Sequence, residues 1–174
     1  MNMRKINFQH GLWTLVAASL LVFTLVSCDG IAKKRASKHW STTINHQFPN
    51  TNWAFEEEVL DFSFDIEDTS RYYDLSVILQ YDTGVVTLKD IPLSLTLSTP
   101  DGMKSFSSSH FLLDKANNPD IKMLDTNTAE LGVLVYPHRK FKVPGTYTLT
   151  VYRRAEKADN YGFISLSTNV NVSK

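Results

Sequence analysis

The stretch Val59–Glu67 reads VLDFSFDIE and decides the fold class of this chain. Apolar residues occupy every second position, with acidic or hydroxyl residues between them: Leu60, Phe62, Phe64 and Ile66 alternate with Asp61, Ser63, Asp65 and Glu67. Because successive side chains of a strand point to opposite faces, this alternation predicts a strand with one buried face and one solvated face.

The same period of two recurs along the rest of the chain. Apolar and polar residues alternate in Asp74–Tyr81, in Leu93–Ser98 and in Tyr147–Tyr152. The run Ala129–Tyr136 is more continuously apolar, which predicts a strand covered on both faces. The last run is expected to place four apolar residues on one face: Ile164, Leu166, Val170 and Val172.

Turn signals separate these runs. Thr99-Pro100-Asp101-Gly102 and Pro144-Gly145 have the composition of tight turns, and Asp114–Asp125 is expected to form a long surface loop. No convincing helical stripe appears beyond the N-terminal region. Several β-rich segments divided by turns predict an all-β fold, an antiparallel β-sandwich of the jelly-roll or immunoglobulin-like kind, with residues 46–174 as its single domain.

Composition excludes several classes of protein. The chain has 174 residues, 18 basic against 18 acidic side chains, and one cysteine. Zero net charge argues against a nucleic-acid binder, so no nucleic acid is expected as a partner. A single cysteine excludes an intramolecular disulfide framework and any cysteine-rich metal site.

The N-terminus has the pattern of an export signal. Arg4 and Lys5 precede Leu12–Val26, an uncharged apolar run that is shorter than the roughly 20 residues a membrane-spanning helix needs. The run ends in Leu25-Val26-Ser27-Cys28, which resembles the lipobox of bacterial lipoproteins. The resemblance implies that residues 1–27 are a signal peptide and that Cys28 carries the lipid that anchors the chain to a membrane. A plain cleavable signal peptide and an uncleaved anchor helix are the alternatives.

Residues 28–45 are interpreted as the lipidated cysteine and a basic tether. Lys33, Lys34, Arg35 and Lys38 follow the anchor, whereas residues 39–174 hold 12 basic against 17 acidic side chains. A polybasic segment beside a membrane can rest on anionic headgroups. A solvated spacer is an equally good interpretation of the same residues.

The order of these segments resembles the GldH-like family of gliding-motility-associated lipoproteins of Bacteroidetes. The resemblance rests on the lipobox cysteine and on three later segments: Phe48-Pro49-Asn50 with Trp53, DFSFDIEDTS (61–70) with Tyr73-Asp74-Leu75, and FKVPGTYT (141–148). Residues 81–92 and 103–111 depart from the family's pattern, which places the chain at its edge or in a sister family. The resemblance implies a component of a cell-envelope complex, linked to gliding motility or the associated secretion machinery.

The resemblance also bears on localisation. Surface-exported lipoproteins of Bacteroidetes typically carry acidic residues after the cysteine, whereas Asp29 is here followed by basic residues. We therefore expect a protein anchored in the outer membrane and facing the periplasm, with other envelope proteins as its partners.

No catalytic pattern emerges, so neither an enzyme nor a cofactor is expected. The chain has no G-x-S-x-G elbow and no glycine-rich phosphate loop. Its histidines beyond the signal peptide never occur at metal-ligand spacing: they are His39, His46, His110 and His138. His110 follows Ser107–Ser109, but neighbouring strand residues face opposite ways, and a polar turn explains these serines better.

Four acidic residues leave a weaker possibility open. Asp61, Asp65 and Glu67 share the polar face of one strand, and Asp68 follows at its end. Such oxygen-rich clusters can hold Ca²⁺, and paired carboxylates can cleave glycosidic bonds. An ordinary solvated strand face, which also discourages edge-to-edge pairing, explains them better.

Aromatic residues near the ends of the predicted strands form the candidate partner surface: Trp53, Arg71, Tyr72 and Tyr73. Trp, Tyr and Arg dominate protein–protein hot spots. Tyr72 and Tyr73 are expected in a turn between two strands, whereas Trp40 and Trp53 could instead close the ends of the sandwich. Two functions remain: docking onto an envelope complex, or binding a carbohydrate or another ligand at the cell surface.

Overall fold

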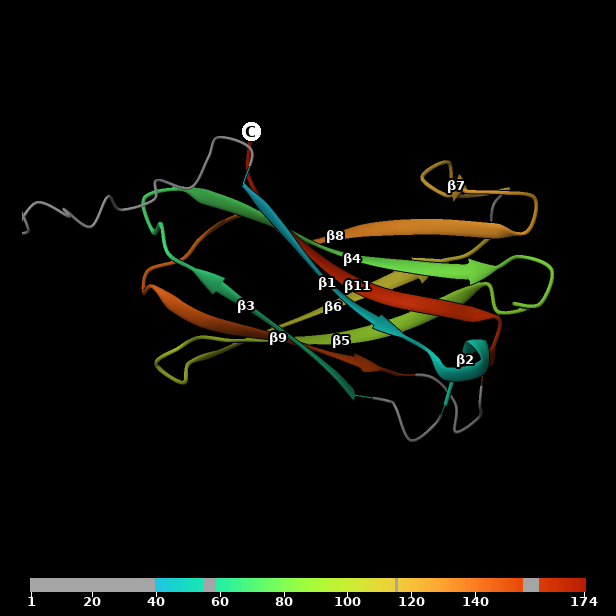
Figure 1. Ribbon diagram of the computed structural model, residues 1–174, viewed down its shortest axis with the longest axis horizontal. Coiled ribbons are helices and arrows are strands. Elements are labelled where there is room, and N and C mark those ends of the chain that lie inside the picture. The colour runs from blue at the N-terminus through green and yellow to red at the C-terminus, as the bar shows by residue number, and fades with distance from the viewer. Residues whose placement is uncertain (1–39, 55–58, 115, 155–159) are drawn as a thin grey trace, which may run out of the picture. The chain divides into compact units, whose positions relative to one another are not determined.

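The computed structural model of the chain describes residues 40–54, 59–114, 116–154 and 160–174 (Figure 1). The expected signal peptide, the lipid attachment at Cys28 and the basic residues Lys33–Lys38 lie outside these ranges. So do Glu56–Glu58, which precede the strand that decides the fold.

Two antiparallel sheets pack face to face as a β-sandwich, so the predicted all-β fold is confirmed (Figure 1). The first sheet has the order β1 (Ser41–Gln47), β11 (Phe163–Val172), β4 (Tyr72–Asp82), β8 (Thr128–Lys140) and β7 (Lys122–Met123). The second sheet has the order β3 (Val59–Ile66), β9 (Gly145–Arg153), β5 (Asp90–Ser98) and β6 (Lys104–Leu112). A 3₁₀ turn, Pro49–Thr51, precedes a two-stranded pair formed by β2 (Asn52–Trp53) and β10 (Asn160–Tyr161).

The strand β3 has the structure that its alternation predicts. Leu60, Phe62, Phe64 and Ile66 are buried between the sheets, and the residues between them are exposed. The same pattern is confirmed in β4, β5 and β9, whose inward side chains complete the core. Burying a Leu or Phe side chain contributes about 1.5–3 kcal/mol, so this core is the main source of stability.

The strand β1 begins inside the segment that the sequence analysis assigned to the tether. Ser41 to Gln47 pair with Asn171 to Ser165 of β11, so the sheet already includes residues 41–45. The local sequence, STTINHQ, has one large apolar residue, Ile44, and therefore shows no alternation. Pairing with β11, more than a hundred residues away, makes this segment a strand.

Two strands, β8 and β11, contain bulges and differ from the predicted faces. In β8 the pairing passes from Ser76↔Leu134 to Leu75↔Tyr136, which leaves Val135 as an extra residue. The bulge returns Tyr136 to the buried face. Leu134, before the bulge, lies on the outer face of the regular alternation and is 52% exposed, so the expectation that Ala129–Tyr136 is covered on both faces is wrong. In β11 a similar shift at Ile164 removes that residue from the face of Leu166 and Val170, which are buried as expected.

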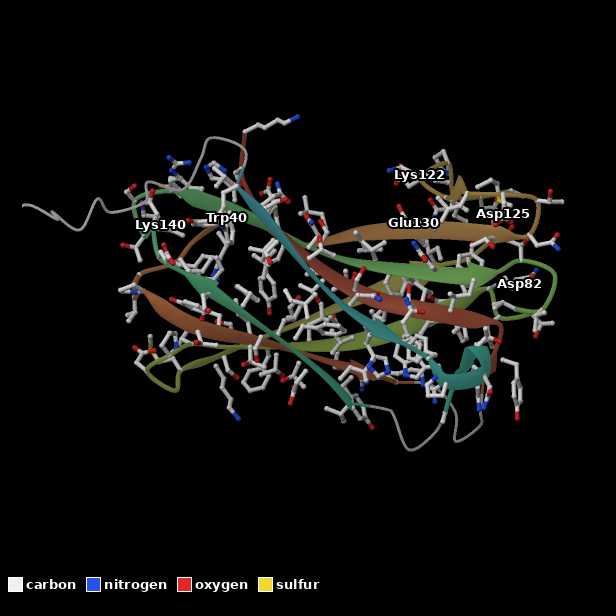
Figure 2. All side chains as sticks on the ribbon, in the orientation of Figure 1. Trp40, Asp82, Lys122, Asp125, Glu130 and Lys140 are labelled. Atoms are coloured by element: carbon white, nitrogen blue, oxygen red, sulfur yellow. The ribbon has the colours of Figure 1, made fainter. Side chains whose placement is uncertain are left out.

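The registers define two ends of the sandwich. At the first, Tyr73 pairs with both Arg139 and Val172, and Trp40 lies edge-on to the Tyr73 ring with centroids 5.6 Å apart. We name it the entry end, because the described chain begins there at Trp40. Phe48, Trp53 and Phe163 lie at the other, the far end. Figure 2 shows Trp40 and Lys140 at the entry end and Asp82 and Lys122 toward the far end.

Candidate functional site

Trp53 does not belong to an exposed surface. It has 0% exposure, stacks on Phe48 at 4.9 Å between ring centroids and meets Phe163 edge-on at 5.9 Å. The guanidinium carbon of Arg153 lies 5.3 Å from its ring centroid. Trp53 therefore closes the far end of the core, which was the alternative interpretation of this residue.

Tyr73 is also buried, which removes it from the candidate partner surface. Its ring meets Phe141 at 5.5 Å between centroids, and its hydroxyl donates to the backbone oxygen of Asp68 at 2.7 Å. Burial raises the pKa of the Tyr73 hydroxyl above its ordinary value. Tyr72 and Tyr73 are the first residues of β4 rather than part of a turn.

Tyr72 is exposed, at 44%, and is held in place by two side chains of β8. Its ring lies flat on the His138 ring, with centroids 4.1 Å apart and planes inclined by 9°. The Lys140 ammonium lies 5.0 Å from the Tyr72 ring centroid and donates to the backbone oxygen of Ser70 at 2.6 Å. We call these three residues, Tyr72, His138 and Lys140, the Tyr72 stack.

A second irregularity of β8 positions His138. The pairing skips from Leu75↔Tyr136 to Tyr73↔Arg139, and His138 adopts a left-handed backbone conformation with φ 50°. Such a conformation costs a non-glycine residue about 1–2 kcal/mol. Asp74 compensates, because its carboxylate accepts hydrogen bonds from the His138 amide at 2.8 Å and from the Ser173 hydroxyl at 2.6 Å.

Arg71 lies in the turn that leads into β4. Its Nε is 3.0 Å from the Asp68 carboxylate. The pKa of Asp68 is held below its ordinary value, chiefly by the Ser70 hydroxyl and amide and less by Arg71. The turn therefore supports Tyr72, and of the four residues predicted as a partner surface only Arg71 and Tyr72 are accessible.

The acidic residues of β3 do not converge. The Asp61 and Asp65 carboxylates each accept a hydrogen bond at 2.6 Å from a threonine of β9, Thr150 and Thr146 respectively. Asp68 is occupied by its own turn. Within the described ranges, no three acidic, histidine or cysteine side chains come together as potential metal ligands.

The serines before His110 form no turn. They belong to β6, so their interpretation as a polar turn is wrong. His110 points to the outer face of the sheet, where its Nδ1 lies 3.0 Å from the Asp90 carboxylate. Ser109 alternates with it and faces the other way.

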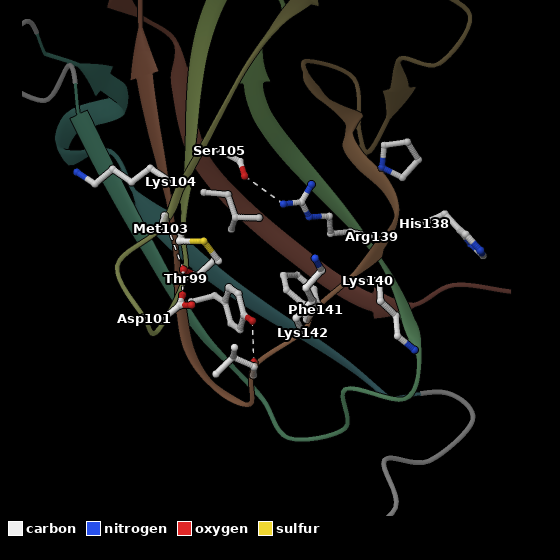
Figure 3. Close-up of a pocket in the computed structure, with 14 residues that line it drawn as sticks. Thr99, Asp101, Met103, Lys104, Ser105, His138, Arg139, Lys140, Phe141 and Lys142 are labelled. Carbon is white, nitrogen blue, oxygen red and sulfur yellow. Dashed lines mark hydrogen bonds between the residues drawn. The ribbon is translucent and has the colours of Figure 1, made fainter.

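An open pocket of about 570 Å³ lies at the entry end, between the β5–β6 hairpin and the end of β8 (Figure 3). Its lining includes Lys104, Arg139, Lys140 and Lys142, together with His138 and a single acid, Asp101. Thr99 and Ser105 also line it, together with six apolar residues: Leu97, Met103, Pro137, Phe141, Val143 and Tyr147.

The side chains of His138, Arg139 and Lys140 point to two different sides of β8. Figure 3 shows Arg139 directed toward Ser105, whose hydroxyl accepts a hydrogen bond from Nη2 at 3.1 Å, whereas His138 and Lys140 point away. The guanidinium carbon of Arg139 also lies 5.7 Å from the Tyr136 ring centroid. The pocket and the Tyr72 stack are thus adjacent sites on opposite sides of one strand.

Sequence reasoning missed both the pocket and two members of the stack. Tyr72 pairs with Lys140 across sheet one, 68 positions later in the chain. The pocket draws its residues from 97–105 and 137–147. The only available signal was the basic run His138-Arg139-Lys140 with Lys142 in an otherwise acidic domain.

No protein-family model and no curated protein matches the chain. Among solved structures, it is similar to infectious bursal disease virus, Gx strain, with a TM-score of 0.43 and 14% identity over 79% of this chain and 33% of the viral one. The dimeric latent PorU of Porphyromonas gingivalis matches with a TM-score of 0.34 and 13% identity over 82% of this chain and 14% of PorU. The Drosophila NLP-core matches with a TM-score of 0.31 and 11% identity over 78% of this chain and 99% of the NLP-core chain.

This chain therefore spans about a third of the viral chain and a smaller part of PorU. At these identities and TM-scores the matches carry no inference about function. Among the described residues, no helix has the length and apolar character that crossing a membrane requires.

Proposed function

We propose that this chain is a lipid-anchored, non-enzymatic protein of the cell envelope that docks onto an envelope complex. The lipobox at Cys28 supports the anchor, and the GldH-like resemblance supports a complex linked to gliding motility or secretion. The proposed location is the outer membrane, with the domain facing the periplasm.

The observation that carries the docking role is the Tyr72 stack. An exposed tyrosine held flat against His138 and capped by Lys140 loses little side-chain entropy when a partner covers it. Tyrosine is also one of the residue types that dominate the binding energy of protein interfaces. Arg71, in the preceding turn, extends the same surface.

In-cell crosslinking of the full-length protein, followed by mass spectrometry, tests this role. We expect a defined set of envelope proteins that crosslinks to the wild type and is reduced at least tenfold by Tyr72→Ala. Tyr161→Ala is the matched control, because Tyr161 is 60% exposed but lies in β10 at the far end. Equal loss in both variants, or loss in neither, would contradict docking through this surface.

Lipid anchoring has its own test. Intact-mass analysis of the protein from native membranes should show a chain that begins at Cys28 with two or three acyl chains. A Cys28→Ala variant should lose membrane association, because a chain without acyl groups has no stable anchor. An unmodified Cys28 would refute the anchor and leave the docking test unaffected.

A second candidate function is carbohydrate binding by the outer face of the second sheet. Phe106 of β6 is 77% exposed there, and Tyr152 of β9 lies on the same face, with β5 between the two strands. Aromatic rings on a flat sheet can stack on sugars. A glycan array tests this function: the wild type should bind and Phe106→Ala should not. That result, together with an absence of crosslinked proteins that depend on Tyr72, would favour carbohydrate binding over docking.

A further inference from the structure

The entry-end pocket collects positive charge in an acidic domain. Residues 39–174 hold 12 basic side chains, and four of them line this pocket: Lys104, Arg139, Lys140 and Lys142. Of the acidic side chains that the structure describes, only Asp101 does so. An open pocket with such an excess of cations attracts an anion, and its concave shape strengthens the local field.

These cations are not neutralised within the molecule. No carboxylate of the described residues forms an ion pair with any of the four. The Asp101 carboxylate instead accepts a hydrogen bond from the Thr99 hydroxyl. Arg139 is already oriented by Ser105 and Tyr136, so its guanidinium is preorganised for an anionic group.

Most of the other lining residues are apolar. The exposed apolar surface comes from Met103 of the hairpin turn, together with Pro137 and Val143. Buried core residues lie behind it: Leu97, Phe141 and Tyr147. A small inorganic anion would leave this apolar surface exposed to water. The combination suits an amphipathic ligand with an anionic head and a hydrocarbon part.

The pocket lies at the end of the domain where the described chain begins, which is the end nearest in sequence to the proposed lipid anchor. The pocket lies between strand ends that meet at the entry end, where Trp40 packs against Tyr73. Cys28 precedes Trp40 by 12 residues, which span at most about 40 Å when extended. Given the proposed lipid anchor, on which this step rests, the entry end is held close to the membrane surface.

We propose that this pocket binds the phosphate headgroup of an anionic phospholipid, with Arg139 and Lys142 contacting the phosphate. The ammonium groups of Lys104 and Lys140 point away from Arg139 and contribute only to the positive field around the pocket (Figure 3). The apolar wall receives the glycerol and the first part of an acyl chain. Binding orients the domain on the membrane, so that the adjacent Tyr72 stack is presented in a defined direction.

Native mass spectrometry of the full chain in a neutral detergent tests the proposal. The probes are dihexanoyl phosphatidylglycerol, which is anionic, and dihexanoyl phosphatidylcholine, which is zwitterionic, with glycerol phosphate and hexaglutamate as further arms. We expect phosphatidylglycerol to bind at least tenfold more tightly than each of the other three. Each phosphate-contacting lysine contributes about a fivefold change in affinity near a lipid surface.

The variant Lys142→Gln should weaken phosphatidylglycerol binding about fivefold. The Lys142 side chain has no hydrogen bond or ion pair among the described residues, so the variant is expected to fold normally. Lys122→Gln is the matched control, because Lys122 is exposed and lies away from the pocket. It should bind as the wild type does.

Several results would overturn the proposal. Equal binding of both lipids, or unchanged binding in the pocket variant, would show that the charges do not form a headgroup site. Tighter binding of glycerol phosphate or hexaglutamate would assign the pocket to a soluble anion or an acidic peptide. The same spectra report the mass of the chain, so an unacylated Cys28 would be recognised separately as failure of the proposed anchor.

Discussion

The two ends of this sandwich place the same chemistry in opposite environments. At the far end, Arg153 lies over the Trp53 ring and both side chains are buried. At the entry end, Arg139 lies at a similar distance over the Tyr136 ring but remains partly exposed on the wall of a pocket. An arginine over an aromatic ring can therefore either close a core or line a binding site.

Aromatic rings pack closely at both ends. At the far end, Phe48, Trp53 and Phe163 fill the space between the sheets with rings less than 6 Å apart. At the entry end, Phe141 and Tyr147 are buried as well, with centroids 4.5 Å apart, but their outer sides line the pocket. Aromatic packing therefore stabilises both ends, and the entry end adds a partly exposed arginine on the wall of a pocket.

The variant Trp53→Ala is expected to have the largest effect, and it tests how much stability the far end contributes. Removing this buried ring should lower the free energy of unfolding by about 3–5 kcal/mol, since it leaves a cavity beside Phe48, Phe163 and Arg153. Urea denaturation followed by circular dichroism measures the change. A loss below 1 kcal/mol would show that the far end does not depend on this residue, and Trp53→Phe should retain part of the stability.

Two glycines, one at each end, test how tightly the two ends are packed. Gly162, with φ +91°, would place a Cβ 2.8 Å from Cγ2 of Val86, whereas Gly102, with φ +82°, has nothing within 4 Å of that position. Gly162→Ala should cost about 1–3 kcal/mol, and Gly102→Ala should cost less because only backbone strain opposes it. Thermal unfolding of both variants gives the difference, and equal losses would mean that packing at the far end is not tight.

A pH-dependent contribution is expected at the entry end from Asp68. Its lowered pKa means that the charged form is favoured in the folded state, so the stabilisation is present above the ordinary value of 3.8 and is lost as the pH falls through the lowered value. Asp68→Ala should therefore cost about 0.5–1 kcal/mol at neutral pH. The gap from the wild type should shrink in acid, and a gap independent of pH would contradict this origin.

The smallest effect is expected for the pocket lysine Lys142. Lys142→Gln should change the free energy of unfolding by less than about 0.5 kcal/mol, because this side chain has no internal hydrogen bond or ion pair among the described residues. Chemical denaturation measures it. A large loss would show that the charge is structural, and the proposed headgroup site would then lack support.

Much of the fold was predictable from local pattern. In β3, β4, β5 and β9 a period of two specifies both the strand and its buried face, because burial selects apolar residues at alternate positions. The edge strand β1 was not predictable, since its polar sequence becomes a strand through pairing with β11. The bulges at Val135 and Ile164 were not predictable either, because they depend on the register of a distant partner.

The candidate site was predictable only in part. Tyr72 was identified as an exposed aromatic residue, but Trp53 and Tyr73 are of the same residue types and lie in the core. Composition alone does not distinguish an aromatic residue that closes a core from one that binds a partner. His138 and Lys140 join Tyr72 only because β4 and β8 pair in one register.

The sequence by itself determined the class of fold and the faces of its central strands, since both follow from the alternation of neighbouring residues. Only the tertiary structure decided which end of the sandwich carries a basic pocket. That outcome depends on side chains from two hairpins that meet through sheet pairing and packing, and such long-range geometry leaves no periodic signal along the chain.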